Sequence, residues 1–383
     1  MRVRHGELRA PELTLGQKVW QLNWGLLLLV AACTGVGLAM LFSAANGDWD
    51  PWASRHAVRF GLGVAVMMVV ALIDIRLWMR YAYVIYAVAL LLLVAVELAG
   101  TIGMGAQRWI DLRFFQLQPS EIMKIALVLA LARYFHTLNF EDIGRIGHLI
   151  TPVLLVAAPV VLILRQPDLG TAIMLAAGSA VLFFLAGVRL WKFALVGLAG
   201  LGSVPIAWNF LHDYQKKRIL TFLDPEKDPL GSGYHILQSK IAMGSGGMTG
   251  KGFIRGTQSH LNFLPEKQTD FIFTMLAEEF GLMGGLALMG LYALIMIYGF
   301  AIAVRARSQF ARLVGMGVTT TFSLYVFINI AMVMGVIPVV GVPLPLVSYG
   351  GTAMLTVMIG FGLLMNVYVH RDTRIGRRWS DHG

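Results

Sequence analysis

Long apolar stretches alternate with short polar connections along most of the chain. A helix that crosses a membrane needs about 20 mostly apolar residues, because each backbone polar group must be satisfied within the helix. Stretches close to this length predict about ten helices, at residues 22–43, 56–73, 81–99, 120–135, 148–164, 169–188, 192–210, 271–304, 311–336 and 351–369. The predicted fold is an all-α polytopic membrane protein with both termini on one side.

Composition supports a membrane protein and excludes several other classes. Of the 383 residues, 57% are hydrophobic and 14% are charged, and the mean hydropathy is +0.70. The 31 Lys and Arg residues outnumber the 21 Asp and Glu residues. They are scattered between apolar stretches, so nucleic acid is not expected as a partner. Cys33 is the only cysteine, which excludes a disulfide framework or a cysteine metal site within this chain.

The basic residues also predict an orientation. Connections on the side of the termini carry most of the Lys and Arg residues. The short connections on the other side carry only Arg55, Arg59, Arg108, Arg113 and Arg165. Because cytoplasmic loops are enriched in basic residues, both termini are predicted to be cytoplasmic. Residues 1–383 then form a single membrane domain with tails at 1–21 and 370–383. One long extracytoplasmic loop, residues 211–271, joins helices 7 and 8.

Two segments differ from simple spans and connections. Eight glycines fall within residues 231–256, which favours tight turns or a close approach to a ligand. Residues 336–351 read VIPVVGVPLPLVSYGG, where three prolines interrupt an apolar stretch. Non-helical backbone at membrane depth is tolerated where it is buried in protein or lines a cavity. The alternative is an ordinary connection that contains prolines.

Asp270 is the main catalytic candidate. It precedes an apolar stretch without interruption and lies at the outer mouth of the predicted eighth span. A carboxylate there could act as a general base toward a hydroxyl group. The alternative is structural, since an Asp or Thr at the start of a helix commonly caps backbone N–H groups. Glu266 and Lys267, in the same LPEKQTDF sequence, are candidates for lining the site.

Charged residues near predicted span ends provide further candidates for a polar cavity. Glu121 and Lys124 are three residues apart and share one helix face, which fits either a ligand site or a structural ion pair. Arg108 could bind phosphate through its planar guanidinium, or form a solvated pair in its loop.

Two more candidates come from the short turn between helices 5 and 6 and from helix 8. Arg165 and Asp168 flank Pro167, and a local ion pair between them is the structural alternative. Glu278 lies close to the helix face of Asp270, whereas Glu279 is turned away.

Several catalytic motifs are absent from the sequence. It contains no phosphate-binding P-loop, no dinucleotide glycine motif and no HExxH. The nine histidines show no metal-ligand spacing, so no protein metal site is predicted.

Six stretches, in this order, resemble the SEDS family, whose name stands for shape, elongation, division and sporulation. They read GAQRWIDL, FQLQPSEIMK, RQPDLGTA, GYHILQSKIAMGSGGMTGKGF, TQSHLNFLPEKQTDFIFTMLAEEFG and VVGVPLPLVSYGG. The resemblance extends from about Thr101 to Val369. It identifies Asp270 with the aspartate of the family's PExHTDF motif, its expected catalytic residue. Gln268 stands where the family usually has His, which puts in doubt a proton role at that position.

The resemblance implies a peptidoglycan glycosyltransferase of the bacterial inner membrane that acts in cell elongation and rod shape. Its substrates would be lipid II and the growing glycan strand, joined with inversion at the anomeric carbon and release of undecaprenyl pyrophosphate. No tightly bound cofactor is expected, although a divalent cation (Mg or Mn) could accompany the pyrophosphate. Candidates for holding the pyrophosphate are Arg108, Lys124, Arg165 and the loop residues Lys216, Lys217 and Arg218. Expected partners are a class B penicillin-binding protein and membrane proteins of the elongation complex.

Three other functions stay open at this point. The chain could be a lipid II flippase, a division-specific polymerase of the same family, or a scaffold that recruits the transpeptidase. A motif-rich polar loop on one face only favours a polymerase over a flippase.

Overall fold

A computed structural model of the chain describes residues 14–103, 106–111, 116–139, 141–210, 213–224, 232–261 and 266–376. Parts of the predicted tails and of the predicted loop lie outside these residues. The helices are α1 (Leu15–Trp20), α2 (Trp24–Ala44), α3 (Trp52–Leu72), α4 (Ile75–Ala99), α5 (Pro119–Thr137), α6 (Ile146–Arg165), α7 (Leu169–Ala186), α8 (Leu190–Phe210), α9 (Asp213–Leu223), α10 (Ser232–Gly246), α11 (Thr257–His260), α12 (Ile272–Arg305), α13 (Gln309–Val333) and α14 (Gly351–Val369).

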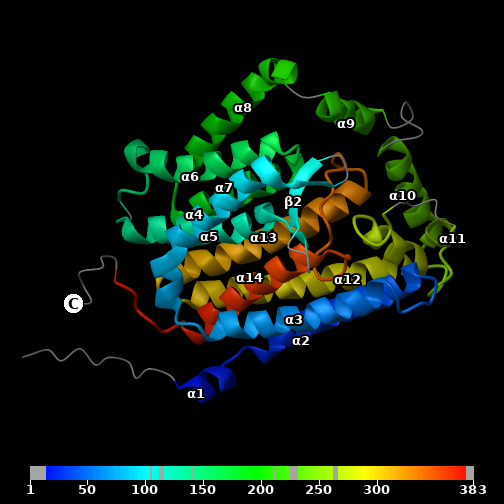
Figure 1. Cartoon of the computed structure of the whole chain (residues 1–383), viewed down its shortest axis with the longest axis horizontal. Helices are drawn as coiled ribbons and strands as arrows, with labels where there is room; N and C mark the ends of the chain where they lie inside the picture. Colours follow the sequence, from blue (N-terminus) through cyan, green and yellow to red (C-terminus); the bar gives the residue numbers. More distant parts are fainter. Residues whose placement is uncertain are drawn as a thin grey trace, which may run out of the picture.

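The described chain is a helical bundle, which confirms the predicted fold class (Figure 1). Among the described residues, eight helices are long and apolar enough to cross a membrane, namely α2, α3, α4, α6, α7, α12, α13 and α14. Two further helices, α5 and α8, fall on the remaining predicted spans. Glu121, Lys124 and Arg133 make α5 less apolar than the others. The total of ten spans stays a prediction.

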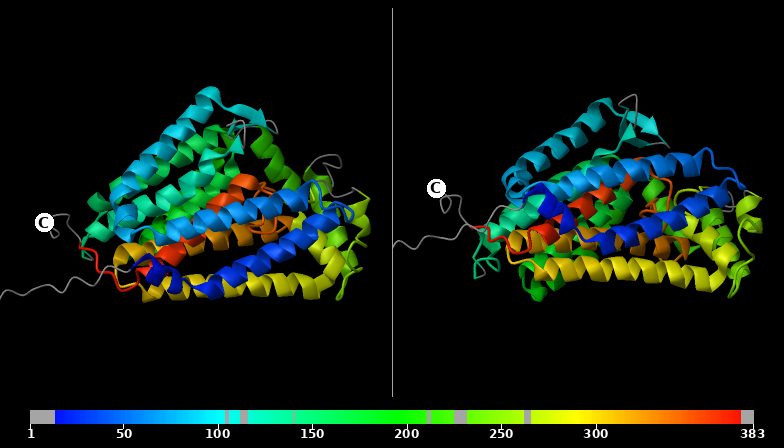
Figure 2. Two further views of the ribbon diagram at one scale, coloured as in Figure 1. Left: turned by 60° about the horizontal axis from the view of Figure 1, so that its bottom comes forward. Right: turned by 90° about the horizontal axis from the view of Figure 1, so that it is seen from below.

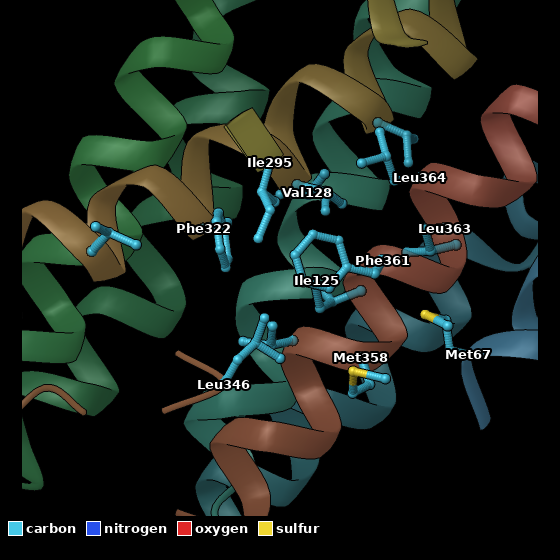
Figure 3. Close-up of a cluster of buried hydrophobic side chains, with 14 of the residues drawn as sticks. Met67, Ile125, Val128, Ile295, Phe322, Leu346, Met358, Phe361, Leu363 and Leu364 are labelled. Carbon is cyan, nitrogen blue, oxygen red and sulfur yellow. The ribbon is translucent and has the colours of Figure 1, made fainter. Parts of the chain in front are cut away.

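The centre of the bundle is formed by α5, α13 and α14, whose side chains are mostly buried. Figure 3 shows aromatic and aliphatic side chains from several helices meeting there. The rings of Phe322 on α13 and Phe361 on α14 are 5.1 Å apart. Within a membrane, helices associate through close packing, which small residues at the contacts allow. Gly362 of α14 fits against Val70 of α3, where an added methyl group would come within 2.8 Å of Cβ.

A small antiparallel sheet lies between α4 and α5. Its strands, in the order β1-β2-β3, are β1 (Thr101–Gly103), β2 (Ala106–Asp111) and β3 (Gln116–Leu117). The sequence predicts only a short connection here, because strands of two to six residues leave no clear alternating pattern.

The two ends of the bundle are built differently (Figures 1 and 2). At one end, α10, α11 and the start of α12 form a cap over the helices. At the other end lie α1 and the end of α14, and Lys18 of α1 donates a hydrogen bond to the Leu72 carbonyl at 3.1 Å. Between them, α8 runs away from the bundle toward α9, and most of its described side chains are exposed.

The glycine-rich segment forms a turn that is bonded to a break in α12. The predicted uninterrupted helix from residue 271 is wrong in this respect, because Gly281 has φ 65° and ψ −163°. The amides of Lys251 and Gly252 donate to the carbonyls of Glu278 and Glu279 at 3.1 and 2.9 Å. In return, the amide of Leu282 donates to the Gly247 carbonyl at 2.9 Å. The break exposes backbone groups that the turn then satisfies.

Candidate active site

Asp270 lies where the two irregular segments of the sequence meet. The turn that leads into α12, residues 266–271, is held against residues 336–350. The Ser348 hydroxyl donates to the Thr269 carbonyl at 2.6 Å, and the Tyr349 amide donates to the Gln268 carbonyl at 2.8 Å. The proline-rich segment is therefore the support of the Asp270 turn, and not only a connection between helices.

Asn329 of α13 ties the same two segments together. Its Nδ2 donates to the carbonyl of Asp270 at 2.9 Å and to the carbonyl of Val342 at 2.7 Å. A buried amide that donates to two backbone carbonyls fixes both segments relative to α13. The backbone of Asp270 is thus positioned from a central helix of the bundle.

The carboxyl group of Asp270 is half-buried and faces residue 341. Its Oδ2 lies 3.5 Å from the position that a Cβ on Gly341 would take, and Gly341 has φ +71°. The structure does not support the capping alternative. Phe271, and not Thr269 or Asp270, is the N-cap residue of α12, and its side chain makes no capping hydrogen bond. The Asp270 side chain is half-buried on the side of the turn that faces Gly341.

Glu121 and Lys124 of α5 form a buried polar group with Tyr325 of α13. Lys124 Nζ is 2.5 Å from Glu121 Oε1, and the side chains are only 3% and 5% exposed. The Tyr325 hydroxyl contacts both of them. Tyr325 and Asn329 are one helical turn apart and share one face of α13. The ion pair, one of the two alternatives for these residues, is present, and it contacts Tyr325, one turn from the residue that holds Asp270.

The turn between α6 and α7 is held by different contacts from those expected. Arg165 pairs with Glu97 at 3.6 Å, so the local ion pair with Asp168 is wrong. Asp168 caps α7 by accepting from the amide and hydroxyl of Thr171 at 3.2 and 2.9 Å. Arg108 donates to the carbonyls of Gln166 and Pro167. These interactions give Arg108 and Asp168 structural roles.

The N-terminus of α7 nevertheless borders the site. A methyl group at Gly170 would lie 2.8 Å from the Val340 carbonyl, so α7 packs directly on the proline-rich segment. Asp168 also accepts a weak hydrogen bond from Gln118 at 3.4 Å. This places Asp168 at the edge of the same region.

Glu266 and Lys267 belong to the turn but differ in exposure. Glu266 is exposed and accepts from the Thr269 hydroxyl at 3.0 Å. Lys267 is only 6% exposed and donates to the Ser259 carbonyl at 2.9 Å. Burial disfavours its charged form and lowers its pKa. Lys267 therefore joins the turn to the end of α11.

Glu278 does not line a cavity with Asp270. Its side chain is completely buried and accepts from Lys251 Nζ at 2.8 Å. It also accepts from the Gln258 amide at 2.8 Å and from the Ser259 amide and hydroxyl at 3.1 and 2.7 Å. These donors occupy both oxygens, so Glu278 organises the loop.

Glu279, the next residue, contacts a different neighbour. Its Oε1 lies 3.1 Å from His260 Nε2 and also accepts from the hydroxyl of Ser43 on α2. This carboxylate therefore fastens the cap to the first long helix.

The sequence missed several residues that build the site. Asn329 is a polar residue inside an apolar span, which is a signal of a functional or supporting role. The sequence indicates for Arg59 only a charge in an outer connection. Its guanidinium lies 4.5 Å above the ring of Tyr349, and its Nη1 is buried without a hydrogen-bond partner among the described residues. Arg59 also touches Gly351 at the start of α14.

No cluster of three or more His, Cys, Asp or Glu side chains suited to a metal ion occurs within the described residues. Lys216 lies on α9. The side chains of Lys217 and Arg218 lie outside the described part of the chain.

Sequence comparison places these features in a known family. The family described as cell cycle protein, which groups FtsW, RodA and SpoVE, matches residues 23–373. The chain is 45% identical over 351 residues to the peptidoglycan glycosyltransferase MrdB of Escherichia coli, covering 90% of this chain and 93% of that protein. It is 37% identical to MrdB of Helicobacter pylori over 83% of each chain.

Solved structures agree with the sequence relationship. A chain of a peptidoglycan synthase complex that coordinates polymerization and crosslinking matches with a TM-score of 0.79 and 35% identity, over 91% of this chain and 98% of that chain. The rod shape determining protein RodA of Thermus thermophilus matches with a TM-score of 0.70 and 30% identity, over 92% of this chain and 98% of that chain.

Proposed function

Because the chain belongs to the family that groups FtsW, RodA and SpoVE, we propose that it polymerises lipid II into glycan strands during cell elongation. The resemblance to the SEDS family is confirmed, and the RodA-like peptidoglycan glycosyltransferase expected from it is supported by relatives of that name at 45% and 37% identity. The substrates, the catalytic residue and the orientation in the membrane belong to the proposal.

One observation carries the catalytic role of Asp270. Its backbone is fixed by Asn329, and the neighbouring Gln268 and Thr269 carbonyls are held by Tyr349 and Ser348, while the carboxyl group itself is half-buried at the surface of the turn. A general base needs a defined position and access to its substrate. Asp270 has both, whereas the nearby Glu278 has no access.

The reaction then follows from the position of this carboxylate. The incoming lipid II offers a sugar hydroxyl, and Asp270 accepts its proton as the oxygen attacks the anomeric carbon of the donor. The new bond forms on the face opposite the α-linked pyrophosphate, which inverts the centre to a β linkage. Undecaprenyl pyrophosphate leaves with the electron pair of the broken bond.

Positive charge is needed beside the leaving group. We assign this role first to Arg59, whose guanidinium stacks on Tyr349 and has a buried Nη1 without a described partner. Lys124 adds a second positive charge, which its ion pair with Glu121 largely balances. A divalent cation, Mg²⁺ or Mn²⁺, would be held mainly by the pyrophosphate oxygens.

The orientation follows from the predicted topology. The Asp270 end would face the outside of the bacterial cytoplasmic membrane, where lipid II is polymerised. Because Cys33 is buried, single cysteines can report on the two faces. A membrane-impermeant maleimide should label Asp48→Cys but not Arg305→Cys in intact spheroplasts. The reverse pattern would contradict this orientation.

The expected partners are a class B penicillin-binding protein and membrane proteins of the elongation complex. Support comes from the similarity to a chain of a peptidoglycan synthase complex. Co-purification from membranes, with and without the candidate transpeptidase, tests this assignment.

Purified Asp270→Ala, assayed with labelled lipid II, tests the catalytic role. Polymer should be absent both with and without the transpeptidase, while the variant unfolds at the temperature of the unchanged protein. A folded variant with normal polymer yield would exclude Asp270 as the base. Lipid II translocation by the unchanged protein, measured after reconstitution into vesicles, tests the flippase alternative. That alternative predicts that the unchanged protein translocates lipid II but makes no polymer.

A further inference from the structure

A polar cavity lies at the end of the bundle opposite Asp270. It has a volume of about 470 Å³ and is lined by His136, Arg307, Ser308, Gln309, Arg312, Arg374 and Ile375. The two sites are far apart, because α12 has 34 residues and runs from one to the other. At 1.5 Å per residue this helix is about 50 Å long. The cavity borders the turn between α12 and α13. This turn lies at the end of the bundle where the described chain ends (Figure 2), on the face that is predicted to be cytoplasmic.

The wall of this cavity is built by a defined segment after α14. The amide of Arg307 donates to the Arg371 carbonyl at 2.9 Å, and His136 Nε2 lies 3.3 Å from the Gly376 carbonyl. Ile375 is buried between these two attachments. The chain thus folds back over the turn between α12 and α13. The cavity is a consequence of tertiary structure and not of loose surface side chains.

The lining is strongly cationic. Three arginines and a histidine line the cavity, and none of its described lining residues is acidic. The N-terminus of α13, capped by the Ser308 hydroxyl at 3.1 Å from the Ala311 amide, adds partial positive charge. Like charges gathered in one concave site repel each other unless an anion is present.

The acidic residue Asp372, near the cavity, pairs with Arg307 and Arg371, and not with Arg312 or Arg374, within the described residues. Asp372 lies 3.4 Å from Arg307 and 3.8 Å from Arg371, but it is 73% exposed and outside the cavity lining. Arg312 and Arg374 form no ion pair within the described residues. The ordinary explanation, cytoplasmic arginines that follow the positive-inside rule, accounts for their side of the membrane. It does not account for their convergence on one cavity.

We propose that this cavity binds a phosphate ester, with Arg312 and Arg374 as the main ligands. Guanidinium groups match phosphate oxygens with paired N–H donors. The volume lies within the range of small-molecule sites, about 300–1,000 Å³, and leaves room for the group that carries the phosphate. Two sources have this chemistry on the predicted cytoplasmic face, the headgroup of an anionic phospholipid and a soluble phosphorylated compound.

The test measures binding directly and does not depend on polymerase activity. The full-length protein is placed in nanodiscs of phosphatidylcholine alone, or with added phosphatidylglycerol, and its thermal unfolding and retained lipid are measured. A parallel arm titrates inorganic pyrophosphate into the phosphatidylcholine nanodiscs. Stabilisation by phosphatidylglycerol alone assigns a lipid headgroup. Stabilisation by pyrophosphate that is lost when Arg312 and Arg374 are replaced assigns a soluble ligand, because pyrophosphate bound beside Asp270 would not respond to those replacements.

The decisive variant is Arg312→Gln combined with Arg374→Gln. Both side chains are exposed, so folding in phosphatidylcholine should be unchanged. The matched control, Arg76→Gln with Arg305→Gln, removes the same charge from exposed positions outside the cavity. Binding should weaken about tenfold or more in the cavity variant only, since charge-assisted contacts are lost. Equal binding by both variants, or no stabilisation of the unchanged protein by either probe, would overturn the proposal.

Discussion

Two acidic regions at the start of α12 have opposite environments. Around Asp270, the backbone is held by neighbouring segments, while the carboxyl group stays half-buried at the surface. Two turns later, the Glu278 carboxylate is completely buried and receives hydrogen bonds from Lys251, Gln258 and Ser259. One region fixes the backbone and presents the side chain, and the other uses the side chain to fix the backbone.

This difference separates chemistry from architecture within one motif. A carboxylate whose oxygens already accept several hydrogen bonds is stabilised as an anion and is shielded from a substrate. A partly exposed carboxylate on a fixed turn can meet a hydroxyl group. Substitutions at the two positions should therefore affect different measurements.

The largest expected effect is that of Asp270→Asn on polymerisation. The amide keeps the shape of the side chain but cannot accept the proton, and a general base typically contributes about 10²–10⁴ in rate. The polymerisation rate should fall by at least about a hundredfold, with the thermal unfolding midpoint unchanged. Asp48→Asn, an exposed carboxylate at the same end, is the control and should keep its rate. A large drop in the unfolding temperature of Asp270→Asn would show that Asp270, like Glu278, has a structural role.

Glu278→Gln should instead destabilise the cap. The change removes the charge that pairs with Lys251 and places an NH₂ group against backbone donors, at a cost of about 3 kcal/mol. Proteolysis of the segment between α10 and α12 and thermal unfolding both report this loss. Glu97→Gln, which breaks only the exposed pair with Arg165, should change stability by less than about 1 kcal/mol. Similar values for the two variants would argue against a structural role of Glu278.

Gly281→Ala tests the bonded turn behind Glu278. Its φ of 65° and ψ of −163° suit glycine alone, and a methyl group would meet the backbone of Met248. We expect a loss of about 2 kcal/mol in unfolding free energy. Gly290→Ala in the same helix has open space around it and should be neutral or slightly stabilising. Equal effects at both positions would contradict the break.

Asn329→Ala should reduce activity more than stability. It releases the carbonyls of Asp270 and Val342, so the base loses its position, and we expect about a tenfold lower rate. Asn366→Ala is a close match, because that amide also binds helix-end carbonyls, including Ala71 at 3.0 Å, far from Asp270. Unfolding should change similarly in both variants, and only Asn329→Ala should lose activity. A rate loss in both would mean that the effect is general.

The smallest expected effect concerns Lys267 and pH. Its pKa is lowered by burial, so between the folded and unfolded pKa values the unfolded chain binds more protons. Stability should therefore rise slightly as the pH approaches the usual lysine value of about 10.4. Lys267→Met should lack this rise when unfolding is followed from pH 8 to pH 10. An unchanged slope would show that Lys267 is not its source.

Much of this arrangement was predictable from the sequence. Hydropathy identified the helical fold, resemblance pointed to Asp270, and spacing placed Glu121 and Lys124 on one helix face. The supporting contacts were not predictable, because Asn329 and Ser348 act through backbone carbonyls that lie far away in the sequence. The alternative of an ion pair between Arg165 and Asp168 is wrong, because Arg165 pairs with the α4 residue Glu97 instead.

The glycine content predicted a structured segment but not the contacts that it makes. The eight glycines indicated a built segment, and the structure uses Gly250 to approach the Glu279 carbonyl. The break at Gly281 had no separate signal, because a single glycine within an apolar helix is common and is usually tolerated.

The turn after α10 bridges the break at Gly281. It is bonded to the carbonyls of Glu278 and Glu279 before the break and to the amides of Leu282 and Met283 after it. A displacement of α10 would therefore be passed to α12 on both sides of Gly281, while the contacts of Asn329 and Ser348 hold the Asp270 turn in place.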